Sequence, residues 1–247
     1  MLFIYAILLS TIAGFSTLLG YLVVFLKIPS NKINEFITLS LSFSIAIMIG
    51  VSVTDLLPES LLYIFYKYNI YISITITLLS FIMGFILTYL INYLLKKNDD
   101  SLYKLGILSM IALMLHNFPE GIATFMGSVK SSTLGIKLTI AIMLHNIPEG
   151  ISIAVPIYYS SKSKKKAFIY TFISAVAEPF GALITYLLLR RYITDILLNI
   201  TLILVSSIMI TLSIEEMLPK ALEYKKNKYI YIGLSLGIII IILNLII

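Results

Sequence analysis

The sequence predicts an all-α fold: a polytopic membrane protein with eight transmembrane helices, in a single integral membrane domain that covers residues 1–247. Composition is the first reason, because 60% of the 247 residues are hydrophobic and the mean hydropathy is +1.02. Segment length is the second, because several apolar runs exceed the ~20 residues with which a helix crosses the hydrocarbon core of a bilayer. Inside lipid the backbone polar groups must be satisfied within each segment, and helices do this.

The predicted spans are separated by short polar connections. The first begins at Leu2 with no basic region before it and no small-residue cleavage site, so we interpret it as a span and not as a removed signal. In chain order, the eight apolar segments are Leu2 to Leu26, Phe36 to Leu57, Ile70 to Leu95, Leu102 to Gly127, Leu134 to Tyr158, Ala167 to Leu189, Ile196 to Leu218, and Tyr229 to Ile247.

Basic residues lie in the connections, which explains the net charge of +6 without a nucleic-acid-binding surface. Cytoplasmic loops of membrane proteins carry an excess of Lys and Arg, so the side with more of them is expected to be cytoplasmic. We therefore expect a multi-pass protein of the cell membrane, surrounded by the lipid bilayer, with both termini extracytoplasmic. Thirteen basic residues follow the odd-numbered segments: Lys27, Lys32, Lys96, Lys97, Lys104, Lys162, Lys164, Lys165, Lys166, Lys220, Lys225, Lys226 and Lys228. Five lie on the other side: Lys67, Lys130, Lys137, Arg190 and Arg191.

An internal repeat relates the two ends of the chain. The stretch Asp55-Leu-Leu-Pro58 in the second segment resembles Glu216-Met-Leu-Pro219 in the seventh. Gly20 and Gly181 are separated by the same number of residues as Asp55 and Glu216, a spacing here called the repeat interval. Segments one to three therefore correspond to segments six to eight, in opposite orientation, around a central pair formed by segments four and five. Inverted repeats of this kind are typical of secondary transporters.

One six-residue pattern occurs twice in the central pair, and it contains both histidines of the chain. On a helix its His, Asn and Glu are at positions i, i+1 and i+4, so their side chains share one face about a turn long. Such a set of N and O donors suits a divalent cation, and without cysteine no thiolate can contribute. The two copies, whose spacing is here called the motif interval, are His116-Asn117-Phe118-Pro119-Glu120-Gly121 and His145-Asn146-Ile147-Pro148-Glu149-Gly150.

The competing interpretation is that these polar residues are buried side chains with ordinary protein partners. Two identical polar blocks in apolar helices favour the functional interpretation, because an intramembrane carboxylate costs roughly 2.5–3.5 kcal/mol at mid-bilayer. Both blocks lie near the middle of their segments, at the depth where carriers bind their substrates.

Glu178 is a further intramembrane acid, and its repeat counterpart is Thr17, so the acid is present in only one half. The alternative for Glu178 is a proline-associated helix kink, although a mid-span Glu is too short to reach water. A second acidic group lies at span ends, where an entrance and ordinary solvated helix ends are equally good interpretations: Asp55, Glu59, Glu215 and Glu216.

The HNFPEG and HNIPEG motifs on consecutive helices of an eight-span chain resemble the ZIP (Zrt/Irt-like) family of metal transporters, over essentially the whole chain. The resemblance implies one integral membrane transporter domain and a binuclear metal site in which Glu120 and Glu149 bridge the ions. The ligands that it implies are His116, Asn117, Glu120, His145, Asn146, Glu149 and Glu178.

The resemblance also implies import of divalent transition metals into the cytoplasm, with zinc the usual substrate and iron, manganese, cobalt or cadmium accepted by broad-range members. The metal is then a transported substrate and not a cofactor. A homodimer and an elevator-like movement of segments one, four, five and six against the others are implied as well. Many members carry a His-rich loop after the third segment, whereas Lys96 to Lys104 contains no His, so metal sensing by that loop is not expected.

Two other functions use the same kind of site. A metal-selective channel would have the same ligands, and sequence does not distinguish it from a carrier. An intramembrane metalloenzyme usually has an H-E-x-x-H motif, which this chain lacks, so we do not expect an enzyme. The G-x-x-x-x-G-K-[ST] loop of an ATP-driven pump is also absent.

Overall fold

The computed structural model describes residues 2–94, 101–189 and 194–246, and every regular element in these ranges is helical. The predicted segment ends Leu95 and Ile247 and four basic connecting residues, Lys96, Lys97, Arg190 and Arg191, lie outside the described residues. The α-helices are α1 (Leu2–Tyr21), α2 (Ile33–Val51), α3 (Leu57–Lys67), α4 (Ile70–Leu94), α5 (Ser101–Lys130), α6 (Ser132–Ser161), α7 (Lys164–Ile184), α8 (Asp195–Leu212), α9 (Leu218–Glu223) and α10 (Asn227–Ile246).

These helices correspond to the eight predicted segments, which confirms the all-α, polytopic fold class. The second segment consists of α2 and α3, and the seventh of α8 and α9, each pair joined by a short helical turn. Among the described residues, seven segments are long and apolar enough to cross a membrane, and the eighth, Asn227–Leu243, is a shorter apolar helix. The second segment, predicted to end at Leu57, continues as a helix to Lys67.

Two π-helical turns explain why the prolines do not end these helices. They are η3 (Ser52–Leu56) and η5 (Ser213–Met217), and each directly precedes a Leu-Pro pair, at Pro58 and Pro219. A proline cannot donate to the carbonyl four residues earlier and clashes with it, so the helix widens in the preceding turn. The two π turns are separated by the repeat interval, so the predicted repeat extends to this backbone feature.

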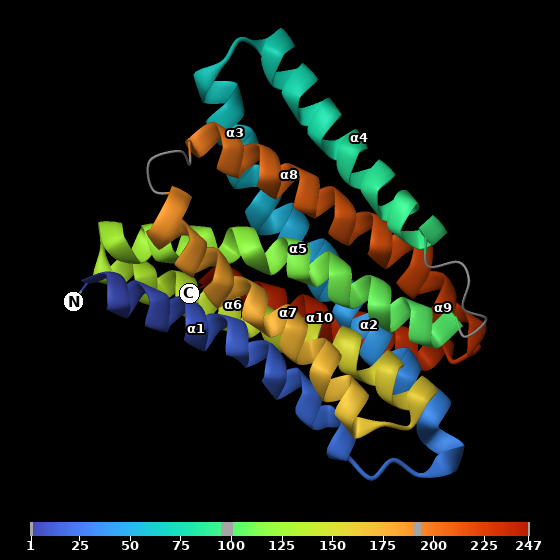
Figure 1. The fold of residues 1–247 in the computed structure, drawn as a ribbon. Helices are drawn as coiled ribbons and strands as arrows, with labels where there is room; N and C mark the ends of the chain where they lie inside the picture. Colours follow the sequence, from blue (N-terminus) through green and yellow to red (C-terminus); the bar gives the residue numbers. More distant parts are fainter. Residues whose placement is uncertain (1, 95–100, 190–193, 247) are drawn as a thin grey trace.

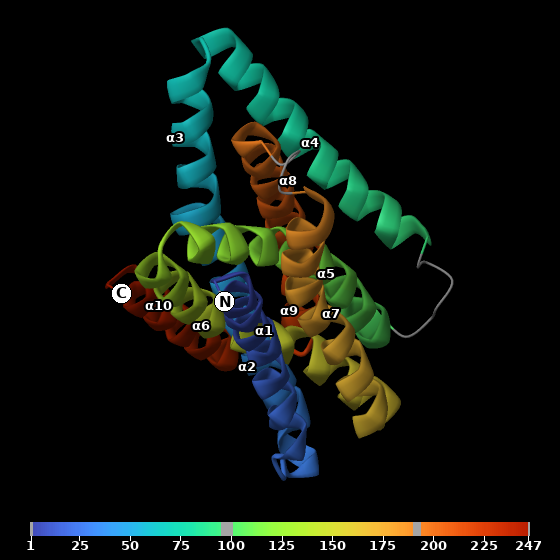
Figure 2. The ribbon, with the colours of Figure 1, turned by 60° about the vertical axis from the view of Figure 1, so that its left-hand side comes forward.

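The helices form two groups (Figures 1 and 2). Helices α1, α5, α6 and α7 pack chiefly against one another, while α2 packs against α10 and α9, and α8 packs against α4 and α3. Helix α4 lies along α8 and stands away from the other helices. The two groups meet where α2 packs on α6 and α5 packs on α8. This division matches the predicted one between segments one, four, five and six and the remaining four.

The largest apolar core lies between the groups at one end of the bundle. It joins η1 (Leu22–Phe25), α2, the first half of α5, the end of α6 and the start of α7 to α8 and α9, and it contains Leu41, Leu105, Ile157 and Leu212, all fully buried. This end carries the lysine-rich connections, such as Lys162 to Lys166. The core lies before His116 on α5 and after Glu149 on α6, so the two motifs lie to one side of it.

Candidate metal site

A buried cluster on α5 and α6 contains both histidines of the chain. Nε2 of His116 lies 3.1 Å from Oε1 of Glu120, and Nε2 of His145 lies 2.9 Å from the same oxygen. One ligand atom from each of the three side chains can be chosen so that all lie within 4.8 Å of one another. All three residues are buried, so an ion held here would be largely removed from water.

The local sequence places these groups together in two ways. His116 and Glu120 are four residues apart on α5, so they are neighbours on one helix face. Helix α6 returns antiparallel beside α5 after Ser131, which brings the second motif opposite the first. The two imidazole rings are 6.3 Å apart, and Oε1 of Glu149 lies 3.7 Å from Nε2 of His116. The predicted meeting of the two motifs is therefore observed.

The asparagines of both motifs make their contacts on the side of α1 and α7, where Glu178 lies. Asn146 donates from Nδ2 to Oε2 of Glu178 and to the carbonyl oxygen of Ala13, both at 3.0 Å. Asn117 donates from Nδ2 to the carbonyl oxygen of Ser174 at 3.3 Å. The two amides thus anchor the motifs to α1 and α7, and their oxygens are left for another partner.

Glycine at the end of each motif makes this approach possible. A Cβ atom on Gly121 would collide with the carbonyl oxygen of Glu178, and one on Gly150 would collide with the carbonyl oxygen of Thr17. The α5–α7 and α6–α1 contacts are therefore backbone-to-backbone. Gly121 and Gly150 are related by the motif interval, and Thr17 and Glu178 by the repeat interval, so the packing follows both sequence patterns.

Several polar atoms of the seven predicted ligands are buried without a hydrogen-bond partner among the described residues. Buried polar groups normally have partners, and an isolated one costs about 1–3 kcal/mol. Such a concentration in one place is typical of a site whose missing partner is a ligand. These atoms are His116 Nδ1, Asn117 Oδ1, Glu120 Oε2, His145 Nδ1, Asn146 Oδ1, Glu149 Oε1 and Oε2, and Glu178 Oε1.

A cavity of about 500 Å³ adjoins the first cluster and extends to Leu62 of α3, whose side chain is exposed. Its lining includes Glu120 and His145 at the inner end and Asp55 and Glu59 from η3 and α3. Asp55 and Glu59 therefore line the same cavity as two of the predicted metal ligands. The corresponding acids Glu215 and Glu216 are not among the residues that line this cavity.

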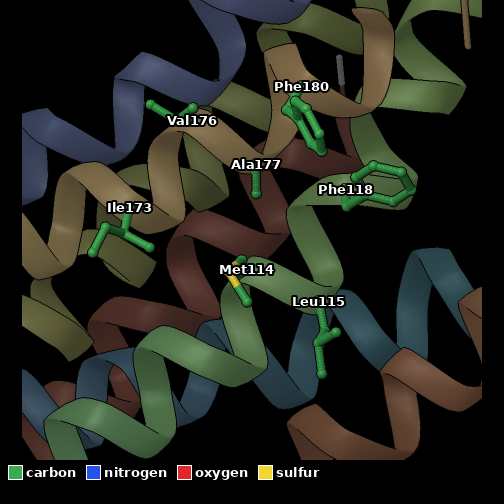
Figure 3. Close-up of a pocket in the computed structure, with 7 residues that line it drawn as sticks. All are labelled: Met114, Leu115, Phe118, Ile173, Val176, Ala177 and Phe180. Atoms are coloured by element: carbon green, nitrogen blue, oxygen red, sulfur yellow. The ribbon is translucent and has the colours of Figure 1, made fainter. Parts of the chain in front are cut away.

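A second cavity, of about 350 Å³, is excluded as a metal site by its chemistry. Its lining is entirely apolar and comes from α5 and α7 (Figure 3), although Phe118 and Ala177 directly adjoin Asn117 and Glu178 in sequence. These two helices therefore present their polar residues to the metal cluster and their apolar ones to this cavity. A charged ion would be unstable here.

Sequence reasoning did not find the backbone partners of this site. The carbonyls of Ala13 and Ser174 hold the two asparagines, and nothing in those residue types indicates the role. The signal that could have found them is the repeat, because the repeat interval relates Ala13 to Ser174 and the motif interval relates the asparagines that contact them.

A buried group of histidine, carboxylate and amide side chains, set at the centre of an inverted helical repeat, is the arrangement of a membrane transporter for divalent metal ions. Comparison with known sequences gives the same class. A family profile described as ZIP Zinc transporter matches residues 96–245.

Curated relatives match nearly the whole chain. The zinc transporter ZupT of Chlorobium luteolum is 38% identical, over 97% of this chain and 96% of that protein. The ZupT proteins of Clostridium perfringens and Streptococcus mutans are 34% and 35% identical, over 97% of this chain and 94% and 96% of theirs. The chain therefore belongs to the ZIP zinc transporter family. It is a multi-pass membrane protein that transports metal ions as substrates, and its relatives are transporters, not enzymes.

Proposed function

We propose that this protein imports zinc across the cell membrane into the cytoplasm, and also accepts iron, manganese, cobalt and cadmium. Residues 1–247 act as one transporter domain with a binuclear metal site at its centre. The seven ligands are His116, Asn117, Glu120, His145, Asn146, Glu149 and Glu178. Zinc follows from the printed names of the relatives and from the imidazole content of the site, since imidazole suits zinc while carboxylate and amide oxygens also suit harder ions.

The observation that carries this proposal is that a single cavity is lined by Asp55 and by two of the proposed ligands, Glu120 and His145. The acids at its mouth would raise the local concentration of cations, and the inner residues would replace the hydration shell. The excess of lysines on the opposite side supports an extracellular position for the cavity mouth. The apolar core on the lysine-rich side would then prevent the ion from leaving directly into the cytoplasm.

The two adjoining groups of donors support a site for two ions. One has His116, Glu120 and His145, with nitrogen ligands. The other has the oxygens of Asn117, Asn146 and Glu178. Glu120 contacts both histidines, and Glu149 Oε1 lies 3.7 Å from His116 Nε2, and we assign these two carboxylates the bridging role.

We further propose that the protein is a carrier, in which α1, α5, α6 and α7 move with the metal relative to the other helices. The division of the helices into two packing groups supports this. Both termini would be extracytoplasmic. The exposed apolar side chains along α4, such as Leu79, Ile86 and Tyr89, support contact with the lipid bilayer. We also propose a homodimer, as the family resemblance implies.

Zinc uptake by purified protein in liposomes tests the proposal, with Glu120→Gln and Glu149→Gln compared with wild type. Loss of one metal ligand should lower uptake at least about tenfold. Glu223→Gln, in an exposed acid on α9, is the matched control and should transport normally. Near-normal uptake by the Glu120 and Glu149 variants would remove the site assignment, and single-channel currents would replace the carrier with a metal-selective channel.

A further inference from the structure

The hydroxyl of Thr17 on α1 is a buried group that the seven proposed ligands leave unexplained. Thr17 is fully buried, and its Oγ1 has no hydrogen-bond partner among the described residues. Buried threonines on α7 and its continuation behave differently. Thr171 donates to the carbonyl of Ala167, and Thr185 donates to the carbonyl of Gly181, each four residues earlier.

The carbonyl that Thr17 would use in this way belongs to Ala13, and other groups occupy it. Asn146 donates to it from Nδ2 at 3.0 Å, and Ser16 donates to it at 2.6 Å. The same Asn146 amide donates to Oε2 of Glu178. The turn of α1 that precedes Thr17 therefore faces the Asn146–Glu178 pair.

A second contact places Glu178 at the same turn. A Cβ atom on Gly14 would lie 2.9 Å from the Cβ of Glu178. Side chains on a helix lean toward its N-terminus, so the side chain of Thr17 covers the turn formed by Ala13 and Gly14. Two independent contacts, one at Ala13 and one at Gly14, thus place the turn that Thr17 covers beside the Asn146–Glu178 pair.

The repeat gives Thr17 and Glu178 equivalent positions. The repeat interval relates them, and each carbonyl oxygen packs closely against a motif glycine: Thr17 against Gly150 and Glu178 against Gly121. The Asn146 contact to Ala13, one turn before Thr17, corresponds to the Asn117 contact to Ser174, one turn before Glu178.

We propose that Thr17 is a further residue of the metal site, whose hydroxyl binds a water molecule in the coordination shell of the transported cation, beside Asn146 and Glu178. A hydroxyl can donate to and accept from such a water, and a water bridge costs little relative to a direct bond. The unpartnered oxygens Asn146 Oδ1 and Glu178 Oε1 would bind on the same side. This inference rests on the proposed function of the site.

The test is zinc affinity of the purified full-length protein, measured by titration calorimetry, together with zinc uptake in liposomes. Thr17→Val removes the hydroxyl and keeps the shape, while Thr17→Ser keeps the hydroxyl. Loss of one hydrogen bond predicts a two- to tenfold weaker affinity, roughly, for Thr17→Val. Thr17→Ser should stay within about twofold of wild type. Thr17→Ala removes the same hydroxyl and serves where the valine variant is not folded.

Thr171→Val is the matched control, because it replaces a buried threonine whose hydroxyl already has a partner, and it should bind zinc normally. Wild-type affinity in Thr17→Val would overturn the inference. Equal loss in Thr17→Val and Thr17→Ser would also overturn it, since packing would then explain the effect. Glu178→Ala separates the two proposals: if it loses zinc binding while Thr17→Val does not, only the role of Thr17 is wrong.

Discussion

Oε1 of Glu120 lies 2.9 Å from Nε2 of His145, although one residue belongs to α5 and the other to α6. This contact joins the two motif copies directly. The imidazole of the second copy is therefore a partner of the carboxylate of the first. A substitution of either side chain should weaken binding of the same metal ion.

Selectivity should depend on the histidines. His145→Ala removes a nitrogen ligand that suits zinc and leaves oxygen ligands that also suit manganese. We expect the ratio of zinc to manganese uptake to fall in this variant, and to a lesser degree in His116→Ala, whereas Glu178→Ala should weaken uptake of both metals. Competition between the two metals in liposomes measures the ratio. An unchanged ratio in His145→Ala would mean that the histidine is structural.

Stability should depend on the motif glycines. The Cβ atom of Gly121→Ala would meet the backbone of Glu178, which cannot move without displacing α7. Such overpacking typically costs about 1–3 kcal/mol, so the unfolding temperature of the purified protein should fall. Gly50→Ala is the control, because its Cβ atom would meet the flexible end of the Ile241 side chain and should cost less. Equal unfolding temperatures for Gly121→Ala and wild type would contradict the close backbone packing.

The orientation of the chain can be tested with introduced cysteines, because the native sequence contains none. Ser131 lies at the turn between α5 and α6, and Ser163 lies between α6 and α7. From the lysine count, cysteine at position 131 should react with an impermeant thiol reagent added outside cells, and cysteine at position 163 only after the membrane is opened. Reaction of both from outside would refute the eight-span orientation.

Much of the site could be predicted because helical periodicity fixes which side chains share a face. The His116–Glu120 pair and the approach of the second motif both follow from this rule and from the antiparallel neighbours. The likeness of the stretches at Asp55 and Glu216 predicted a repeat that the structure extends to the π turns η3 and η5.

Other features depend on interactions that residue types do not indicate. The length of the second segment could not be predicted, because the π turn before Pro58 lets the helix continue to Lys67. Asn117 directly follows His116, so its side chain points about 100° away from that of His116 around the helix. Its amide instead donates to the Ser174 carbonyl. Hydrogen bonds to a backbone carbonyl of another helix depend on how the helices pack, and the residue type that carries the carbonyl does not indicate them.

Anomalous X-ray diffraction from crystals soaked in zinc, recorded above and below the zinc absorption edge, tests the central claim most directly. We predict two peaks at bonding distance, about 2.0–2.2 Å, from the proposed ligands. One should lie at His116, Glu120 and His145, and the other at the oxygens of Asn117, Asn146 and Glu178. Peaks confined to the cavity mouth near Asp55, or to the surface, would contradict the account.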